Sequence, residues 1–366
     1  MKLSISRDSL LEPLQAVVGV VERRQTMPIL ANVLLVAKDG GLTVTATDLE
    51  VELIAEAEVE KLEVAGDITV PGRKLLDITR ALPEGGKIAL QLDGDRLVIK
   101  SGRSRFVLST LPAAEFPLID KIDATTRFKL PQKEVARLLD KTQFSMAQQD
   151  VRYYLNGLLL ETTKKRVRAV ATDGHRLALC DISIENQDVN AGQVIVPRKG
   201  VMELHRLLGT GDEVEVTIGS NHIRAVLAGI RFTSKLIDGR FPDYERVIPS
   251  SEAATLVADR ETLRGALQRA AILSNEKYRG VRLELGKDLL RIQANNPDQE
   301  EARDEIEVEY SGDSIEIGFN VTYLLDALSA VDGNTVEIDF VDANSSCLIR
   351  SPKGTHAKYV VMPMRL

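Results

Sequence analysis

Four histidines, His175, His205, His222 and His356, are the side chains best suited to acid–base or metal chemistry near neutral pH. None of them stands in an H-x-x-x-H pair or beside paired cysteines, which are the spacings that hold zinc. His175 follows Asp173 in the run TDGHR and could act as a general base, but no nucleophile or oxyanion loop accompanies it. We therefore expect no catalytic residue, no metal site and no cofactor.

The stretch Gly85-Gly86-Lys87 has the residue types of a phosphate-binding loop. It is too short for a Walker loop and lacks the Ser or Thr that follows the lysine there, and no G-x-G-x-x-G motif occurs in the chain. A nuclease or nucleotidyl enzyme would need clustered metal-binding carboxylates, and the sequence offers no such cluster. The sequence therefore predicts a protein that is not an enzyme.

The chain repeats itself three times with a period near 124 residues. Three landmarks recur at this interval: the turns Thr47-Asp48, Thr172-Asp173 and Asn295-Asn296; the strand-to-helix steps Val70-Pro71, Val196-Pro197 and Phe319-Asn320; and the closing pairs Phe116-Pro117, Phe241-Pro242 and Met362-Pro363. A solenoid repeat is only about 20–50 residues long, so each copy is a domain with its own core. We predict domains at 1–125, 126–253 and 254–366.

The recurring acidic residue of the first landmark has a structural role in this interpretation. Asp48 and Asp173 occupy one place in their copies, where the third copy has Asn296. Because Asp and Asn both cap tight turns, while only Asp could serve as an acid or base, the exchange favours a turn.

Each copy is predicted to contain two helices and about eight strands. Apolar residues at helical spacing indicate a first helix within 10–21, where Pro13 implies a late start or a kink. The other helices are expected at 73–82, 131–146, 198–208, 260–272 and 320–330, with Asn320 as the N-cap of the last. Strand-rich copies with few helices indicate an α+β fold, with the helices on one face of antiparallel sheets.

Composition narrows the class of protein. The 366 residues contain 4% aromatic residues and no Trp, so the cores must be aliphatic. Cys180 and Cys347 lie in strand-like runs and are expected to be reduced core thiols, which suits a reducing compartment. No signal peptide and no run of 18 apolar residues is present, so we expect a cytoplasmic protein with no membrane partner.

Charge is segregated along the chain, whose net charge is −7. Acidic residues concentrate at 50–63 and 298–309, and the sixth helix carries Asp326 with no basic residue. Basic residues decorate the outer faces of other helices: Arg73, Lys74 and Arg80; Lys133, Arg137 and Lys141; Arg198, Lys199 and Arg206; Arg260, Arg264 and Arg269. These stripes are either ordinary solvated helix faces or one positive surface on an acidic body.

Four long runs carry a family resemblance: QQDVRYYLNG (148–157), ATDGHRLA (171–178), SNEKYRGV (274–281) and YVVMPMRL (359–366). They resemble the bacterial DNA polymerase III β subunits, the replicative sliding clamps, and the likeness covers all 366 residues. The resemblance implies a homodimer that closes head to tail into a ring of six domains. Helices line the hole, sheets form the outer wall, duplex DNA passes through, and the ring tethers the polymerase.

The resemblance also implies DNA contacts at residues whose types match the family: Arg24, Arg73, Gln149, Tyr153, Tyr154 and Arg198. A ring holds DNA by topology, so an acidic net charge is compatible with this function. Weak phosphate contacts allow sliding, whereas contacts to base edges would arrest it.

The implied dimer interface joins the first copy of one protomer to the third copy of the other. Matching apolar residues are Phe106, Leu108, Ile272 and Leu273, flanked by Lys74, Arg96, Arg103 and Arg105 on one side and by Asp298, Glu300, Glu301 and Asp304 on the other. A basic edge and an acidic edge suit antiparallel strand pairing, with ion pairs that set orientation. Alternatively, the acidic residues only protect an exposed sheet edge.

A peptide groove between the second and third copies is the other implied site. The matching residues are Arg152, Leu155, Thr172, Gly174, His175, Arg176, Leu177, Pro242, Arg246, Val247, Asn320, Tyr323, Ser346, Met362, Pro363, Met364 and Arg365. Flexible methionines suit a surface that receives different ligands. Two positions depart from the family pattern: Tyr278 replaces a common Phe, and Asn344 replaces an apolar residue and is expected to alter one wall.

The partners that this groove implies bind through short linear motifs. They are the replicative polymerase α subunit, the clamp-loader δ subunit, translesion polymerases, mismatch-repair proteins and ligase. The alternative function is a three-domain protein-interaction scaffold without DNA in the hole. The two hypotheses differ in whether neutralising Arg24, Arg73 and Arg198 impairs function on DNA.

Overall fold

The computed structural model describes residues 1–21, 27–119, 122–184, 187, 189–209, 211–249, 253–352 and 356–365. Within these ranges the chain forms six α-helices and 25 strands. Its contacts divide it into two compact units, Met1–Val135 with Lys199–Leu236, and Ala136–Arg198 with Ile237–Leu366. The middle third of the sequence therefore contributes to both units, and the three domain boundaries given above stay a prediction.

The first unit contains two antiparallel sheets. One has the strand order β5-β1-β7-β8-β9 and the other the order β10-β15-β16-β17-β4-β3-β2-β6. Their strands are β1 (Lys2–Ser6), β2 (Asn32–Lys38), β3 (Gly41–Thr47), β4 (Val51–Glu58), β5 (Lys61–Val64), β6 (Gly66–Pro71), β7 (Lys87–Asp93), β8 (Arg96–Ser101), β9 (Ser104–Ser109), β10 (Ala124–Pro131), β15 (Glu213–Gly219), β16 (His222–Leu227) and β17 (Ile230–Lys235).

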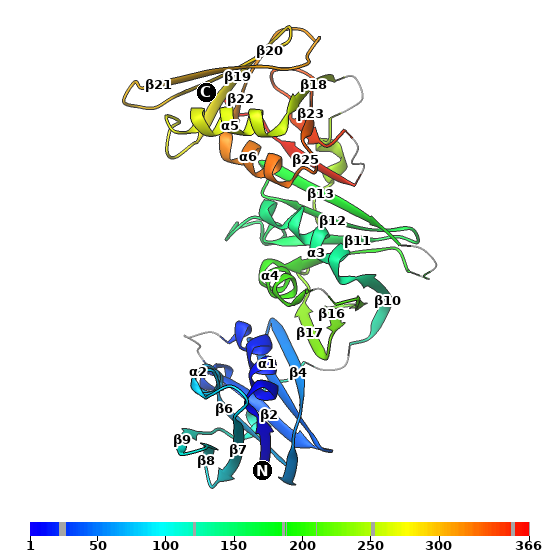
Figure 1. The fold of residues 1–366 in the computed structure, drawn as a ribbon. Coiled ribbons are helices and arrows are strands. Elements are labelled where there is room, and N and C mark those ends of the chain that lie inside the picture. The colour runs from blue at the N-terminus through cyan, green and yellow to red at the C-terminus, as the bar shows by residue number, and fades with distance from the viewer. Residues whose placement is uncertain are drawn as a thin grey trace. The chain divides into compact units, whose positions relative to one another are not determined.

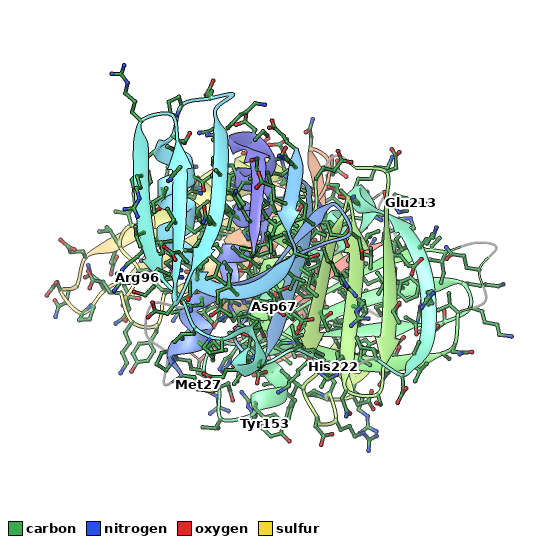
Figure 2. The ribbon with its side chains drawn as sticks, turned by 90° about the horizontal axis from the view of Figure 1, so that it is seen from below. Met27, Asp67, Arg96, Tyr153, Glu213 and His222 are labelled. Atoms are coloured by element: carbon green, nitrogen blue, oxygen red, sulfur yellow. The ribbon has the colours of Figure 1, made fainter. Side chains whose placement is uncertain are left out.

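The eight-stranded sheet of this unit joins two of the sequence repeats. Strands β2, β3, β4 and β6 come from the first repeat, and β17 pairs with β4 in a register that places Phe232 opposite Leu53. Glu213 and His222 mark opposite ends of the antiparallel strands β15 and β16 (Figure 2). One continuous sheet therefore links the first two repeats.

Helix α1 (Arg7–Val17) starts immediately after β1, and α2 (Gly72–Ala81) packs against it (Figure 1). The expectation of a late start for the first helix is wrong, because the hydroxyl of Ser6 caps the helix by accepting the Ser9 N–H. Pro13 lies inside the helix and is itself buried beside Leu10 and Leu14. The cap and this packing outweigh the cost of an interior proline.

The second unit also contains two antiparallel sheets. Their orders are β14-β11-β12-β13-β25-β24-β23-β18 and β21-β20-β19-β22. The strands are β11 (Gly157–Thr162), β12 (Arg166–Thr172), β13 (Arg176–Ser183), β14 (Gly192–Pro197), β18 (Ala254–Asp259), β19 (Gly280–Gly286), β20 (Leu289–Asn295), β21 (Glu301–Glu307), β22 (Ile315–Asn320), β23 (Thr335–Phe340), β24 (Cys347–Arg350) and β25 (Ala357–Val361). The pairing of β13 with β25 joins the second repeat to the third.

Four helices complete the fold. Helix α5 (Arg260–Ala271) packs against α6 (Val321–Ala330), and Asp259 and Asn320 cap their N-termini, as predicted for Asn320 (Figure 1). Helix α4 is Arg198–Leu207. Helix α3 is Gln132–Asp140, shorter than the predicted 131–146, because the chain turns into a 3-10 segment, Gln143–Ser145.

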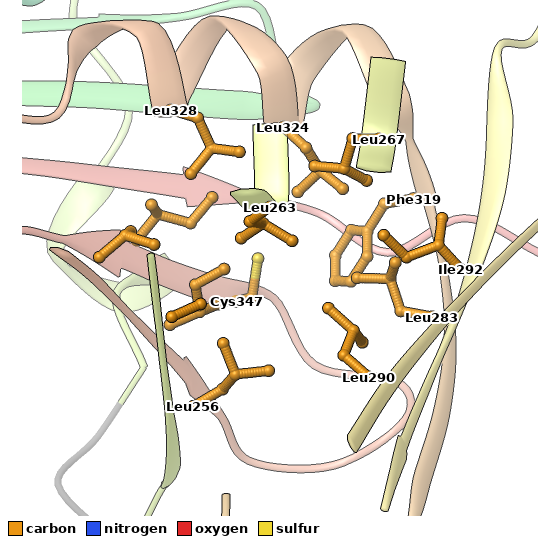
Figure 3. Packing of buried hydrophobic residues seen from close by; sticks show 14 of the residues in the cluster. Leu256, Leu263, Leu267, Leu283, Leu290, Ile292, Phe319, Leu324, Leu328 and Cys347 are labelled. Carbon is orange, nitrogen blue, oxygen red and sulfur yellow. The ribbon is translucent and has the colours of Figure 1, made fainter. Parts of the chain in front are cut away.

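The core of the third repeat is aliphatic, as the composition indicates. Leu263 and Leu267 of α5 and Leu324 of α6 pack onto the sheets around Phe319 (Figure 3). Cys347 is fully buried in this core, and burial raises the pKa of its thiol to about 12. Both cysteines are free and buried, in agreement with the prediction of core thiols.

The recurring Asp/Asn position has the turn role that the sequence predicts. Oδ1 of Asp48 accepts the N–H groups of Glu50 and Val51, and Oδ1 of Asp173 accepts the equivalent pair two and three residues ahead. In the third repeat Oδ1 of Asn296 accepts the N–H of Glu300. These side chains cap tight turns between strands.

Among the residues with a described structure, no helix is both long and apolar enough to cross a bilayer. The same residues contain no group of three or more His, Cys, Asp or Glu side chains arranged to hold a metal ion.

Candidate functional site

A cavity of about 180 Å³ opens where β13 meets β25. Nine of the predicted groove residues line it: Arg152, Leu155, Thr172, Gly174, Arg176, Leu177, Pro242, Val247 and Met362. Four more lining residues were not predicted for the groove, namely Tyr154, Asp243, Tyr244 and Val360. The cavity thus gathers residues that lie up to about 200 positions apart in the sequence.

The floor of the cavity is apolar because of strand pairing. Leu177 of β13 stands directly opposite Val360 of β25, so both side chains lie on the same face of the sheet. Both pack in one hydrophobic cluster with Tyr244, which belongs to the short 3-10 helix Tyr244–Val247. Leu155 is buried at the cavity wall. An apolar side chain of a ligand would therefore find a dry, preformed pocket.

The mouth of the cavity is charged and depends on a glycine. Gly174 has φ +88°, and a Cβ atom there would lie 3.0 Å from the guanidinium of Arg152. Arg152 donates from Nη2 to the carboxylate of Asp150 at 2.8 Å and to the carbonyl oxygen of Asp173 at 3.3 Å. These bonds to Arg152 lower the pKa of Asp150 to about 2. Arg152 is thus held over the glycine by two acceptors.

Arg176 also lines the cavity, and its side chain is fixed by four contacts. Its Nη1 donates to Asp326 at 2.5 Å, its Nε to Asp173 at 3.1 Å, and its Nη2 to the carbonyl oxygen of Phe144 at 2.7 Å. Its Cζ lies 4.6 Å from the ring centroid of Tyr323, a cation–π distance. A side chain bound in this way presents a rigid surface to a ligand.

Several predicted groove residues lie beside the cavity and do not line it. His175 stacks on Tyr323 with 6.5 Å between ring centroids, and its carbonyl oxygen accepts the N–H of Met362. Met364 donates its N–H to the carbonyl oxygen of Gly318. Through these bonds the segment 362–365, which includes half-buried Pro363 and exposed Arg365, connects the turn before β13 with strand β22.

The remaining predicted groove residues have structural partners. Ser346 donates its hydroxyl to the carbonyl oxygen of the cavity residue Val247 at 3.0 Å. Arg246 is exposed and pairs with Asp243 at 2.6 Å. Asn320 caps α6. Asn344, which was expected to alter one wall of the groove, is exposed, and its backbone N–H donates to the carboxylate of Asp342.

The predicted DNA contacts have varied surroundings. Arg24 lies outside the described residues. Arg73 is exposed and donates to the carbonyl oxygen of Val21, while Arg198 donates to that of Met146. Gln149, with φ +55°, is exposed. Tyr153 is 57% exposed and is labelled in Figure 2. Tyr154 is half-buried and lines the cavity.

Some of the basic helix residues bind protein acceptors and are not free surface charges. Lys141 is only 14% exposed and donates to the carbonyl oxygen of Ala330 and to Asp332. Arg206 donates to the carbonyl oxygen of Ala16. Both acceptor carbonyls lie at helix C-termini, where a cation is favourable. Helical spacing alone could not reveal these partners.

Two edge strands carry the residues predicted for the dimer interface. Strand β9 ends the five-stranded sheet and contains Arg105, Phe106 and Leu108; β21 ends the four-stranded sheet and contains three glutamates and Asp304. The predicted basic residues Lys74, Arg96, Arg103 and Arg105 are all exposed, and so are the acidic Asp298 and Glu300.

The third-repeat side of the predicted interface also exposes apolar surface. Ile272 follows the end of α5 and is 75% exposed, and the next residue, Leu273, is half-buried. Asp304 is half-buried and is already paired within the chain, 2.6 Å from Nε of Arg269. This side therefore combines an exposed isoleucine with a charged strand edge.

Comparisons with known proteins agree over the entire chain. Models of the DNA polymerase III beta subunit match in order: the N-terminal domain at residues 1–120, the central domain at 129–243 and the C-terminal domain at 245–365. The chain belongs to the DNA polymerase III beta subunit family. The resemblance inferred from the sequence is thereby confirmed, together with the α+β fold of three repeated clamp domains.

Individual members of the family are similar over their full length. The Beta sliding clamps of Pseudomonas aeruginosa and Escherichia coli are each 53% identical to this chain, and each match covers 100% of both proteins. The crystal structure of the DNA polymerase III subunit beta from Pseudomonas aeruginosa has a TM-score of 0.97 at 52% identity, with both chains fully covered. A Pseudomonas aeruginosa clamp bound to griselimycin has a TM-score of 0.96 at 52% identity, also with full coverage.

Proposed function

We propose that this protein is the DNA sliding clamp, or processivity factor, of a bacterial replicative polymerase. The observation that carries the proposal is the match to Beta sliding clamps along the full length of the chain. The apolar cavity at the β13–β25 junction provides the surface that such a tether needs for its partners. The protein would act by binding its partners and by enclosing DNA, with no chemical step. It would do so in the bacterial cytoplasm, where the chromosome is copied.

Closure into a ring is proposed through the two free sheet edges. Strand β9 of one protomer would pair with β21 of the other, which would extend both sheets across the interface. The basic residues in and near β9 would then face the acidic residues in and before β21, and Phe106 and Ile272 would supply apolar contact. Charge complementarity of this kind fixes the head-to-tail orientation and opposes pairing of two like edges.

DNA is proposed to pass through the hole and to be held by enclosure. The chain has a net charge of −7, so strong general attraction to phosphate is absent. Local contacts from Arg24, Arg73, Gln149, Tyr153, Tyr154 and Arg198 would be few and exchangeable. Such contacts permit sliding because they carry no sequence information.

The groove is proposed as the site for short linear motifs of the partner proteins. An apolar side chain would enter the cavity over Leu177 and Val360, while Arg152 and Arg176 at the rim would bind the peptide backbone or an acidic group. The partners expected from the family are the polymerase α subunit, the clamp-loader δ subunit, translesion polymerases, mismatch-repair proteins and ligase. Griselimycin, a ligand of the Pseudomonas aeruginosa clamp, is proposed to compete with them for this site.

Two measurements test the proposal. Small-angle scattering on an absolute scale should give twice the chain mass of 40.3 kDa and a flat particle with a hollow centre. Protein loaded onto nicked circular DNA by a clamp loader should stay bound at high salt and should be lost when the circle is cut. A monomer without a hollow, or equal loss from intact and cut circles, would instead favour a scaffold that does not enclose DNA.

A further inference from the structure

A row of three charged residues crosses the sheet next to the groove. Glu161 of β11, Arg168 of β12 and Asp181 of β13 stand opposite one another in the antiparallel register. Arg168 donates to both carboxylate oxygens of Asp181, from Nε at 2.6 Å and from Nη2 at 2.9 Å. Its side chain is only 11% exposed. This bidentate, largely buried pair holds the guanidinium in a single orientation.

The same guanidinium binds a residue of the groove wall. Nη1 of Arg168 donates to the hydroxyl oxygen of Tyr244 at 3.1 Å, and that hydroxyl donates to Glu161 at 3.3 Å. The ring of Tyr244 lines the cavity and packs with Leu177 and Val360 of its floor. Tyr244 is thus held by its ring on the cavity side and by its hydroxyl on the charged row.

The first repeat lacks this arrangement at the same sheet positions. Val36, Thr43 and Glu56 occupy the equivalent row across β2, β3 and β4. The residue two places after the closing Pro117 is Ile119, where the second repeat has a tyrosine two places after Pro242. The arginine and the tyrosine are therefore both missing from the first repeat, so the fold of a repeat does not itself require them.

The third repeat has an equivalent arginine, but it lies away from the groove. Arg291 of β20 has the same place in its row and pairs with Glu284 at 2.6 Å and Glu305 at 2.7 Å. None of these three residues lines the groove. An arginine between two carboxylates thus occurs with a groove-lining tyrosine in the second repeat and away from the groove in the third.

We propose that Arg168 is a positioning residue of the groove, which fixes the hydroxyl of Tyr244 and thereby the wall formed by residues 241–248. This inference rests on the proposed function of the groove as a peptide site. A wall that is already in place spares the ligand the cost of ordering it, so the affinity depends on an arginine that does not line the cavity. Among the described residues, Arg168 reaches this wall through the Tyr244 hydroxyl and also through Glu245, whose Oε1 lies 3.5 Å from its Nη1.

The test measures griselimycin binding to the full-length protein by calorimetry, beside thermal unfolding. Arg168→Met removes the guanidinium, Tyr244→Phe removes only the hydroxyl, and Arg291→Met removes the equivalent arginine of the third repeat. We expect affinities roughly three- to tenfold lower for both Arg168→Met and Tyr244→Phe, because each variant removes the charged hydrogen bond between the guanidinium and the hydroxyl. Arg291→Met should bind as the unaltered protein does. Arg168→Lys, which keeps the charge, should restore part of the lost affinity.

Each outcome decides the inference. Reduced affinity in the Arg168 and Tyr244 variants, with an unfolding temperature of Tyr244→Phe close to that of the unaltered protein, supports it. Equal losses from Arg168→Met and Arg291→Met would show a general effect of removing a sheet arginine and would overturn it. Unchanged binding by Tyr244→Phe and Arg168→Met would also overturn it. Failure of the unaltered protein to bind griselimycin would instead refute the proposed function of the groove and the inference with it.

Discussion

Arg176 and Asp326 form a 2.5 Å ion pair that joins a rim residue of the groove to helix α6. The pair gives Asp326, the charged residue of α6, a partner on strand β13. Arg176 is further held by Asp173 and the carbonyl oxygen of Phe144, and its guanidinium lies over the ring of Tyr323. Helix α6 is thereby connected to the rim of the groove by a side chain with few alternative conformations.

Asp326→Asn should weaken groove binding as well as the fold. The amide keeps a hydrogen-bond acceptor but loses the charge, so Arg176 gains freedom at the rim. We expect affinity for griselimycin to fall about three- to tenfold and stability by about 1 kcal/mol, because the pair is only partly shielded from water. Asp332→Asn is the matched control, since Asp332 pairs with Lys141 and lines no part of the groove. Equal affinity in both variants would exclude a role for Asp326 in the groove.

Gly174→Ala tests the mouth of the groove. The new methyl group would meet the Arg152 guanidinium at 3.0 Å and would sit on a backbone with φ +88°. Gly94→Ala is the control, because Gly94 has φ +59° with no atom within 4 Å of an added Cβ. Both variants should lose about 1 kcal/mol of stability from backbone strain. Only Gly174→Ala should also reduce ligand affinity in calorimetry; a similar reduction with Gly94→Ala would contradict this explanation.

The repeat and the turns were predictable because they depend on local residue types. Asp48, Asp173 and Asn296 recur at one period and bond the N–H groups just ahead of them, which any tight turn of this type requires. Helix limits were less predictable. The cap by Ser6 starts α1 before its apolar pattern begins, and Pro13 misled the expectation because tertiary packing compensates for it.

The groove was predictable only in part, for a physical reason. The family resemblance supplied residues on β13 and near the C-terminus, but Tyr244 and Val360 belong to the cavity through long-range packing that no local pattern encodes. The partners of basic residues were equally hard to predict. Lys141 has the spacing of a solvated helix face, yet its ammonium group lies against the C-terminus of another helix. A periodic pattern identifies a face of a helix without identifying what covers it.

Ile272→Asp should dissociate the proposed dimer. Ile272 is 75% exposed, so within one protomer an aspartate costs little, whereas in the interface it would bury an unpaired charge. Self-association measured by analytical ultracentrifugation should weaken at least about tenfold, with the unfolding temperature of the protomer changed by no more than a few degrees. The control Val226→Asp changes an exposed residue of β16, an interior strand of its sheet. Dimers of undiminished stability in the Ile272 variant would argue against this interface.

Glu52 gives the first unit a pH-dependent stability. Glu52 is 2% exposed, and its carboxylate accepts the N–H of Ile119 at 2.9 Å. Burial raises the pKa of this carboxyl despite that bond and the nearby Arg224 and Arg231. A raised pKa in the folded state means that the protonated form is favoured by folding. The protonated carboxyl contributes its full stabilisation at pH values below the pKa that Glu52 has in the unfolded chain. This contribution is lost as the pH rises through the pKa that Glu52 has in the folded protein.

Glu52→Gln should therefore be neutral near pH 4 and stabilising at pH 8, by on the order of 1 kcal/mol. The amide oxygen can still accept the Ile119 N–H, and it brings no charge into the buried site. Unfolding by urea at a series of pH values measures the difference between variant and unaltered protein. Glu56→Gln, an exposed change on the same strand, should show no such trend. The difference in free energy of unfolding, variant minus unaltered protein, could instead fall between pH 4 and pH 8. The ionised carboxylate would then have to be stabilising, and the assigned effect of burial would be wrong.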